Sequence, residues 1–265
     1  MSATGIAARL GGAELELLGR FADASNATLL VRLLDRDPRP LDVLANELGR
    51  DPEVTDLPAG DLAVYKPARG EAPLWDFPAH TLHRREVAAY ELSAALGWDL
   101  VPVTVLRDDG PLGPGSLQRF VPHDLDEHYF HLLELGEPAV LAQLEAMVVF
   151  DLLANNADRK GGHVLLEREG LPAPRVRLID HGVAFHAQYK LRTVGWHFAG
   201  EPLPARLREG VARLLDDLAG SVGDVLARLL APDELEALND RVVATLECNE
   251  LPHPTGPRST PWPLL

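Results

Sequence analysis

Short apolar runs separated by polar turns dominate the first 120 residues of the chain. Runs of this length, bounded by Gly, Pro and Asp, are typical of β-strands. Helical spacing of apolar residues is clear at 81–97, where Gly97 is suited to cap the helix. The pattern predicts a small antiparallel sheet that carries one helix. Its strands are expected as a pair within 14–34 and singly at 61–66, 101–110 and 115–122.

A segment rich in Asp, Pro and Arg, 35–60, interrupts this pattern between the second and third predicted strands. It contains one short helical stretch, LDVLANELG. Because Pro and Asp are typical of turns, we predict that the segment is a loop or an insertion in the sheet.

Helical periodicity dominates the chain after residue 120. The stretch 138–155 is apolar on all sides, which predicts a helix buried in a core. Two short strands are predicted at 163–169 and 175–180, followed by helices at 204–220, 222–231 and 232–247. The last stretch, 251–265, has too many prolines for regular structure, and we expect it to be mobile.

The two patterns together predict an α+β protein of two lobes. The N-lobe, 1–120, would hold the small antiparallel sheet, and the C-lobe, 121–265, would be mainly helical with one short hairpin. A hinge between them is expected near 118–123.

Composition excludes several classes of function. The formal net charge of −15 argues against broad binding to nucleic acid phosphates or to anionic lipid. No apolar run reaches the 18 residues that a transmembrane helix needs, and the N-terminus lacks the features of a secretory signal. Cys248 is the single cysteine, so no internal disulfide can form. These features predict a cytoplasmic protein.

A lysine stands at the end of the third predicted strand, in the stretch AVYKP. Lys66 is one of three lysines among the 25 cationic residues of the chain. A compact, mobile ammonium group at this position could contact a phosphate in a cleft below the sheet. Glu86, on the following helix, could hold the lysine in place. Alternatively, Lys66 is a surface residue and Glu86 an ordinary polar residue of its helix.

Polar residues are concentrated in NNADRKGGH, between the buried helix and the short hairpin. Asp158 could accept the proton of an attacking hydroxyl group or orient that group. His163 opens the first strand of the hairpin and Asp180 ends the second, so both could face one metal ion. Alternatively, the segment is only a polar loop capped by a hairpin, and Asp180 begins an ordinary turn.

The order of these parts is that of a kinase: a strand lysine, a helix glutamate, a linker, an aspartate loop and a hairpin that ends in Asp-x-Gly. Over residues 15–200 the chain resembles the phosphatidylinositol 3-/4-kinase-like superfamily. The similarity is greatest to type II phosphatidylinositol 4-kinases and, more distantly, to HipA-type bacterial kinases. It resembles still more closely an uncharacterised, mainly actinobacterial family of kinase-like proteins. The resemblance is carried by YKP…GE, REVAAYELSAALG…VPVTVL, GSLQRFV and FDLLANNADRKGGHVLL…LIDHGVAF.

The resemblance implies ATP and a divalent cation, Mg²⁺ or Mn²⁺, as cofactors. It implies that Lys66 contacts the α- and β-phosphates with Glu86 as its partner, and that Asp158 is the catalytic aspartate. It implies that Asp180 is the principal metal ligand and that His163 stands where relatives have a metal-binding asparagine. The remaining implied nucleotide contacts are Ser25 and Asn26 in the phosphate-covering turn and the hinge residues Gln118, Arg119, Phe120 and Val121.

Two departures from the kinase pattern keep three functions open. The turn GRFADASNAT is not a glycine-rich G-x-G-x-x-G loop, and the imidazole of His163 suits Mn²⁺ better than Mg²⁺. The first hypothesis is an ATP-dependent phosphotransferase acting on a hydroxyl of a small molecule such as an inositol compound, a lipid head group or a protein Ser/Thr. The alternatives are a nucleotide-binding pseudokinase that regulates a partner and an adenylyltransferase on the same scaffold.

Overall fold

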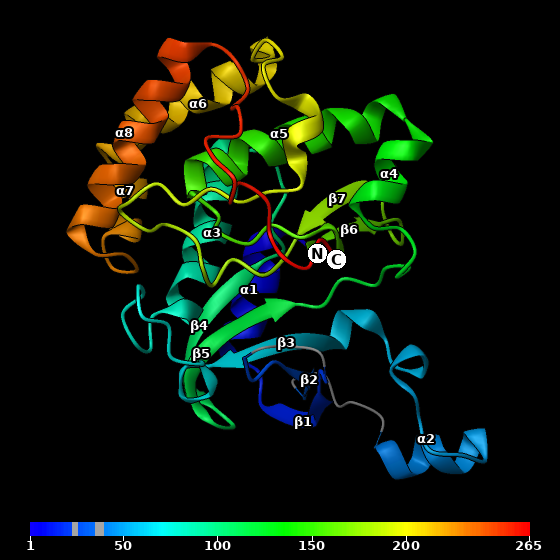
Figure 1. Cartoon of the computed structure of the whole chain (residues 1–265). Coiled ribbons are helices and arrows are strands. Elements are labelled where there is room, and N and C mark those ends of the chain that lie inside the picture. The colour runs from blue at the N-terminus through cyan, green and yellow to red at the C-terminus, as the bar shows by residue number, and fades with distance from the viewer. Residues whose placement is uncertain (23–25, 35–39) are drawn as a thin grey trace. The chain divides into compact units, whose positions relative to one another are not determined.

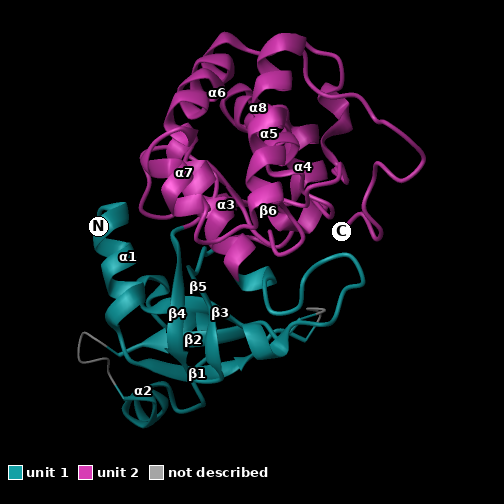
Figure 2. Ribbon diagram, turned by 90° about the vertical axis from the view of Figure 1, so that its left-hand side faces the viewer, with its two compact units in different colours: residues 1–83, 103–122 teal, residues 84–102, 123–265 magenta. Residues whose placement is uncertain are grey.

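The computed structural model describes residues 1–22, 26–34 and 40–265 (Figure 1). They form two compact units: unit 1 contains residues 1–83 and 103–122, and unit 2 contains residues 84–102 and 123–265 (Figure 2). The division expected at residue 120 lies two residues before the end of unit 1 at Pro122, and it differs from these units in one larger respect. Residues 84–102, which include most of the helix predicted at 81–97, pack with unit 2.

Unit 1 is built on an antiparallel sheet with the strand order β1-β2-β3-β5-β4. All the strands predicted before residue 123 are therefore confirmed. Their bounds are β1 Leu15–Arg20, β2 Leu29–Leu33, β3 Leu62–Pro67, β4 Thr104–Gly110 and β5 Gly113–Arg119.

The register of the sheet places Lys66 and Leu30 on the same face. Leu30 lies opposite Val64 on the neighbouring strand, and Val64 and Lys66 are two residues apart on β3. The opposite face carries Tyr65, which is fully buried. Unit 1 therefore has one face closed by packing and one face that presents the candidate lysine.

The closed face is covered by a helix that the apolar pattern did not predict, α1 (Ala3–Gly12). Its N-terminus is capped by Ser2, whose hydroxyl accepts the backbone N–H of Gly5 at 3.2 Å. The buried guanidinium of Arg107 on β4 donates to the last carbonyls of this region, those of Leu10 at 2.7 Å and Ala13 at 2.9 Å. These bonds satisfy carbonyl groups that a helix end leaves without intrahelical partners.

The segment predicted as an insertion contributes to the open face of the sheet. Its helical stretch is confirmed as α2 (Leu41–Leu48), which ends at Gly49 with a left-handed φ of 68°. Short 3-10 turns follow at Val54–Asp56 and Ala59–Asp61. Leu57 packs with Leu30, Leu62 and Phe120 in a small apolar cluster. The described part of the insertion is thus attached to the sheet by apolar contacts and is more than a surface loop.

Unit 2 is mainly helical, as predicted, and contains one two-stranded hairpin within residues 84–102 and 123–265. Its helices are α3 (Leu82–Leu96, from residue 84 on), α4 (Tyr129–Leu135), α5 (Pro138–Ala154), α6 (Ala205–Leu218), α7 (Ser221–Leu226) and α8 (Pro232–Cys248). The hairpin pairs β6 (Val164–Glu167) with β7 (Arg175–Leu178). Of these elements only α4 was not predicted.

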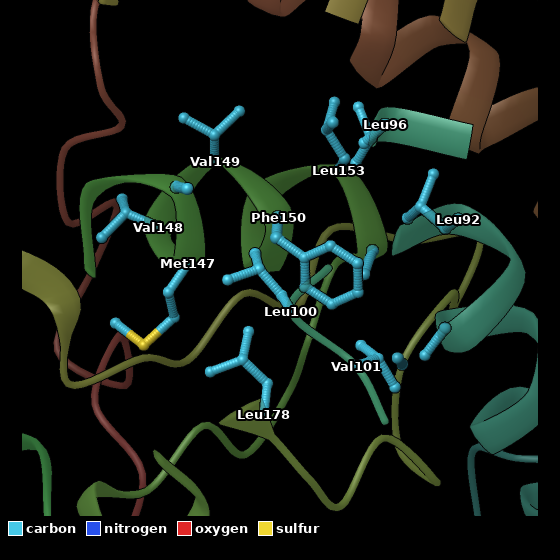
Figure 3. Packing of buried hydrophobic residues seen from close by; sticks show 14 of the residues in the cluster. Leu92, Leu96, Leu100, Val101, Met147, Val148, Val149, Phe150, Leu153 and Leu178 are labelled. Atoms are coloured by element: carbon cyan, nitrogen blue, oxygen red, sulfur yellow. The ribbon is translucent and has the colours of Figure 1, made fainter. Parts of the chain in front are cut away.

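Helix α5 lies at the centre of unit 2. Phe150 and Leu153 on this helix are fully buried and pack with Leu92 of α3, Leu100 and Leu178 of β7 (Figure 3). The apolar composition of α5 on all sides therefore has the predicted cause, burial within a core. Because the polar loop 155–163 follows directly, a rigid helix fixes where that loop begins.

The stretch 251–265 has no helix or strand, as its prolines predict, but it is packed against the rest of unit 2. The carbonyl of Ser259 accepts the backbone N–H of Thr193 at 3.1 Å and the indole N–H of Trp196 at 2.8 Å. The carbonyl of Leu264 accepts the backbone N–H of Gly161 at 2.7 Å. The stretch therefore contacts the same region as the candidate site.

In the described part of the chain, no helix combines the length and the apolar composition required to cross a membrane.

Candidate functional site

The loop that holds Asp158 is shaped by the end of α5. Asn155 follows the helix with a left-handed φ of 50°, a conformation that Asn tolerates better than most residues. The next residue, Asn156, accepts the backbone N–H of Asp158 with its side-chain oxygen at 3.0 Å. Both asparagines are fully buried. Their amides thus replace the regular hydrogen bonds that end with the helix, and they fix the backbone at Asp158.

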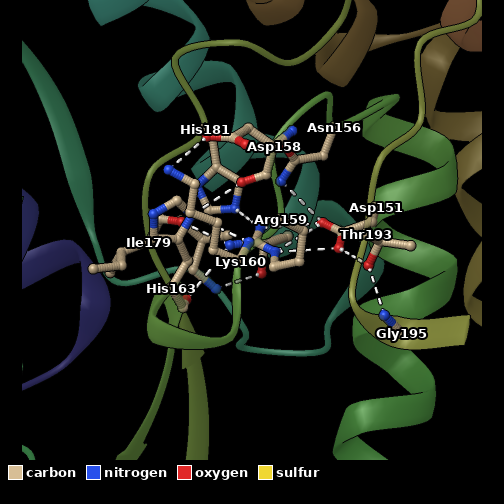
Figure 4. A network of polar contacts seen from close by, with 12 residues as sticks. Asp151, Asn156, Asp158, Arg159, Lys160, His163, Ile179, His181, Thr193 and Gly195 are labelled. Carbon is tan, nitrogen blue, oxygen red and sulfur yellow. Dashed lines mark hydrogen bonds and ion pairs between the residues drawn. The ribbon is translucent and has the colours of Figure 1, made fainter. Parts of the chain in front are cut away.

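A buried ion pair fastens this loop to α5 (Figure 4). Arg159 and Asp151 are both 0% exposed, and Arg159 Nε lies 3.1 Å from each oxygen of the Asp151 carboxylate. Two further groups donate to the same carboxylate, the side-chain amide of Asn156 at 3.1 Å and the hydroxyl of Thr193 at 3.2 Å. A charge buried this deeply is stable only with a charged and hydrogen-bonded partner. Arg159 is therefore neither solvated nor available to a phosphate; it is part of the framework of the loop.

Arg159 also connects Asp158 to the residues on both sides of Asp180. Its guanidinium donates to the carbonyl of Ile179 at 2.7 Å and to His181 Nε2 at 2.7 Å. Since guanidinium groups only donate, His181 Nε2 must be the unprotonated nitrogen of the ring. One buried side chain therefore links the aspartate loop to the Asp-x-Gly turn.

The structure brings together the three residues predicted for catalysis and metal binding. His163 Nε2 lies 3.4 Å from Asp180 Oδ2, and His163 Nδ1 lies 3.1 Å from the backbone carbonyl of Asp158. The His163 ring is thus held on its Nδ1 side by the Asp158 carbonyl and by the backbone N–H of Lys160, at 3.5 Å, while its Nε2 faces the Asp180 carboxylate. A cation between this nitrogen and the carboxylate would have a ligand on each side.

The ligand types can be compared with the implied metal. One imidazole and one carboxylate suit Mn²⁺ better than Mg²⁺, which prefers oxygen ligands only. No group of three or more His, Cys, Asp or Glu side chains within 1–22, 26–34 and 40–265 is arranged to hold a metal. A bound divalent cation would therefore take its other ligands from water and from phosphate oxygens, as is usual where a metal is bound together with a nucleotide.

Burial raises the pKa of Asp158 above its ordinary value, and the nearby negative charge of Asp180 acts in the same direction. The positive charges of Lys160 and Arg192 oppose this rise, Lys160 Nζ lying 3.3 Å from Asp158 Oδ2. The net shift of the pKa is upward. A carboxylate with a raised pKa is a better proton acceptor than a solvated one.

Glu86 has a role that sequence reasoning missed. It is buried on α3, and its Oε2 accepts the backbone N–H of His181 at 3.1 Å. The same oxygen lies 3.9 Å from His181 Nδ1. Glu86 therefore holds the backbone immediately after Asp180. Lys66 belongs to unit 1 and Glu86 to unit 2, so the predicted ion pair between them stays a prediction.

The predicted hinge residues complete the sheet of unit 1. The side chain of Gln118 donates to Thr104 at 2.9 Å. The backbone N–H of Arg119 donates to Val103 at 2.9 Å, and that of Phe120 donates to Leu62 at 3.2 Å. Their contact with an adenine base, and that of Val121, stay predictions.

The turn predicted to cover the phosphates is described only in part, since Ser25 lies outside the described residues. The side-chain oxygen of Asn26 accepts the backbone N–H of Ala72 at 2.7 Å, and Ala27 N–H donates to the Gly70 carbonyl at 3.0 Å. A Cβ on Gly70 would lie 2.2 Å from Ala27 Cβ, so the close approach requires glycine. Asn26 therefore ties this turn to the loop that follows Lys66.

The face of the sheet that carries Lys66 also borders an apolar pocket of about 350 Å³. Leu30 belongs both to this pocket and to the apolar cluster at Phe120. The pocket is within the size range of small-molecule sites. Its lining residues are Leu18, Gly19, Arg20, Phe21, Leu30, Leu41, Pro52, Val54 and Leu57.

Two crystal structures of a kinase are similar to this chain. The crystal structure of the Golgi casein kinase has a TM-score of 0.57 and 13% identity, covering 92% of this chain and 73% of that one. Its crystal structure with Mn/ADP bound gives a TM-score of 0.53 and 13% identity, covering 92% and 74%. The protein thus has the predicted α+β protein-kinase-like fold, with an antiparallel N-lobe sheet and a helical C-lobe. Identity this low establishes the fold alone.

One relative establishes the family. Protein Rv2133c of Mycobacterium tuberculosis (strain ATCC 25618 / H37Rv) is 38% identical over 285 aligned positions, which cover 96% of this chain and 93% of that protein. The chain belongs to the family of Protein Rv2133c. No protein-family model matches it.

Proposed function

We propose that this protein is an ATP-dependent phosphotransferase of the phosphatidylinositol-kinase-like branch that transfers the γ-phosphate to a hydroxyl group. The observation that carries the proposal is the convergence of Asp158, His163 and Asp180 in unit 2. The arrangement is held rigidly by the buried Arg159. The kinase-like fold and the Mn/ADP bound to the Golgi casein kinase support it.

Each part of the chemistry has a candidate residue. Lys66 would contact the α- and β-phosphates, and Asp180 with His163 would hold the divalent cation, which neutralises charge on the phosphate oxygens. Asp158 would orient the acceptor hydroxyl and receive its proton. The acceptor oxygen forms a bond to the γ-phosphorus while the bond from that phosphorus to the β–γ bridging oxygen breaks, and ADP leaves. The raised pKa of Asp158 favours the proton transfer.

The acceptor is proposed as a hydroxyl of an inositol-type small molecule, a lipid head group or a protein Ser/Thr. The net charge of −15 makes an anionic membrane surface the least favourable of these environments.

The test compares Asp158→Ala and Asp180→Ala with Asp124→Ala, which removes an exposed carboxylate of unit 2. Transfer from γ-labelled ATP to the protein, to candidate acceptors and to water is measured with Mg²⁺ and with Mn²⁺. We expect Asp158→Ala to abolish transfer with nucleotide affinity nearly intact. Asp180→Ala should weaken metal-dependent nucleotide binding, and Asp124→Ala should change neither. Normal turnover by Asp158→Ala would refute the assigned roles.

A nucleotide-binding pseudokinase is the second candidate function. It is favoured by the small set of metal ligands, one imidazole and one carboxylate, among the described residues. The pseudokinase would be supported if the protein binds ATP but neither transfers its phosphate nor hydrolyses it, with Mg²⁺ or with Mn²⁺. Intact-mass measurement of the protein and acceptors also separates the two candidates from an adenylyltransferase, because AMP adds much more mass than phosphate.

A further inference from the structure

The side chain of Asn155 is bonded entirely to one distant segment of the chain. Its Nδ2 donates to the carbonyls of His186 at 2.8 Å and Gln188 at 2.7 Å. Its Oδ1 accepts the backbone N–H of Lys190 at 2.8 Å. An Asn amide has two N–H donors and one oxygen. Both donors and the oxygen are thus used to hold the backbone of residues 186–190.

The same segment is attached to the aspartate loop at both of its ends. Before it, the backbone N–H of Phe185 donates to the Ala154 carbonyl at 2.6 Å. After it, Arg192 N–H donates to the Asn156 carbonyl at 2.9 Å, and Arg159 N–H donates to the Arg192 carbonyl at 2.9 Å. The chain between residues 185 and 192 therefore returns alongside the residues that precede and follow Asp158.

The segment offers no accessible Ser or Thr hydroxyl for phosphorylation. The sequence from His181 to Arg192, HGVAFHAQYKLR, contains neither Ser nor Thr, and its single phosphorylatable hydroxyl is that of Tyr189, which is 46% exposed. Thr193 is 0% exposed, and its hydroxyl donates to Asp151 at 3.2 Å and accepts Gly195 N–H at 3.1 Å. In many kinases the segment after the metal-binding aspartate is ordered by a phosphate group. Here, the hydrogen bonds of an uncharged side-chain amide hold the segment in place.

We infer that Asn155 is a positioning residue that keeps residues 186–190 beside Asp158 in the arrangement required for catalysis, without phosphorylation of the segment. The requirement for catalysis rests on the proposed function. The mechanical part, that the amide holds the segment, rests on the three hydrogen bonds alone.

The variant that tests this inference is Asn155→Gly, because glycine keeps the left-handed backbone and removes only the side chain. A matched control is Asn249→Gly at the end of α8. Asn249 also follows a helix in the left-handed region, with a φ of 58°, and its Oδ1 accepts from Arg208 at 3.0 Å. Both variants lose a helix-terminal amide, but only one of the two amides holds residues 186–190.

Hydrogen–deuterium exchange is the first measurement. In Asn155→Gly the amide of Lys190 should exchange about tenfold faster or more, with α5 and the β6–β7 hairpin unchanged. Asn249→Gly should leave residues 186–190 unchanged. Wild-type exchange at Lys190 in Asn155→Gly, or faster exchange throughout unit 2, would overturn the inference.

Kinetics provide the second measurement, with ATP and Mn²⁺ and with turnover normalised to folded protein. Asn155→Gly should lower kcat about tenfold or more while KM for ATP stays within about twofold, because a positioning residue beside Asp158 affects the transition state and not nucleotide binding. Asn249→Gly should keep wild-type kcat and KM. Wild-type kcat in Asn155→Gly would refute the catalytic part.

Phosphatase treatment of the wild-type protein completes the test. Turnover should be unchanged after treatment. A loss of turnover would contradict the inference that residues 186–190 are held in place without phosphorylation. If the wild-type protein transfers no phosphate at all, the proposed function fails, and the exchange measurement still decides whether Asn155 holds the segment.

Discussion

The buried pair of Asp151 and Arg159 allows a quantitative prediction for Asp151→Leu. Both side chains are 0% exposed, so removal of the carboxylate leaves a guanidinium buried without its partner charge. Such a loss costs about 3–5 kcal/mol of unfolding free energy. Asn156 and Thr193 lose an acceptor as well, at about 1 kcal/mol each. Because energetic contributions within one network do not add fully, we expect Asp151→Leu to lower the free energy of unfolding by about 5 kcal/mol in total.

A double substitution separates stability from activity. In Asp151→Leu/Arg159→Met both charges are replaced by apolar groups, and replacement of a buried pair in this way is often neutral or stabilising. The double variant should therefore recover most of the lost stability. It should not recover turnover, since Arg159 no longer bonds the carbonyl of Ile179 and the ring of His181.

Equilibrium unfolding in urea, followed by circular dichroism and tryptophan fluorescence, measures the prediction. Trp196 is a suitable probe because its indole is bonded to Ser259 beside the network. Total stabilities of about 5–15 kcal/mol are usual, so a loss of about 5 kcal/mol leaves the single variant with about 0–10 kcal/mol, and its urea midpoint should fall well below that of the wild type. A cost below about 1 kcal/mol, or full turnover by the double variant, would refute the reasoning.

Three further predictions concern other parts of the molecule. Burial raises the pKa of Glu71, but hydrogen bonds from His83 outweigh it and lower the pKa below its ordinary value. The pair thus stabilises the fold fully above the unfolded-state pKa of about 4.3. The difference in unfolding free energy between wild type and Glu71→Gln should shrink as the pH falls from this value through the lower pKa of Glu71 in the folded protein. Gly115→Ala would place a Cβ 2.5 Å from the Lys66 carbonyl and should cost about 1–3 kcal/mol in urea unfolding, whereas an unchanged midpoint would contradict this packing. Phe150→Ala should cost about 3–5 kcal/mol by the same measurement, because the ring is fully buried, and a cost below 1 kcal/mol would place it outside the core.

Periodicity predicted the strands and nearly all the helices because each element buries one face or lies wholly inside a core. It failed for α1, which buries only two of its residues, Arg9 and Leu10, and for the short α4. Few apolar positions leave little periodic signal. The tail was expected to be mobile because prolines exclude regular structure, but hydrogen bonds from Thr193, Trp196 and Gly161 hold it.

The sequence identified the residues of the candidate site but not the buried contacts that hold them in place. Asp158, His163 and Asp180 were identified from local sequence, and the hairpin register that brings the last two together follows from antiparallel pairing. The role of Arg159 could not be read from the loop, since a cation there could equally be solvated. One signal was present: Asp151 interrupts the apolar helix MVVFDLLA, and an acid in a buried helix requires a cationic partner.

The packing of the C-terminal stretch affects how the protein should be prepared for study. Leu264 is hydrogen-bonded to Gly161, three residues from Asp158, and a Cβ on Gly161 would lie only 2.8 Å from the Leu265 side chain. An affinity tag or reporter joined after Leu265 would therefore emerge beside the reacting groups and could obstruct large acceptors.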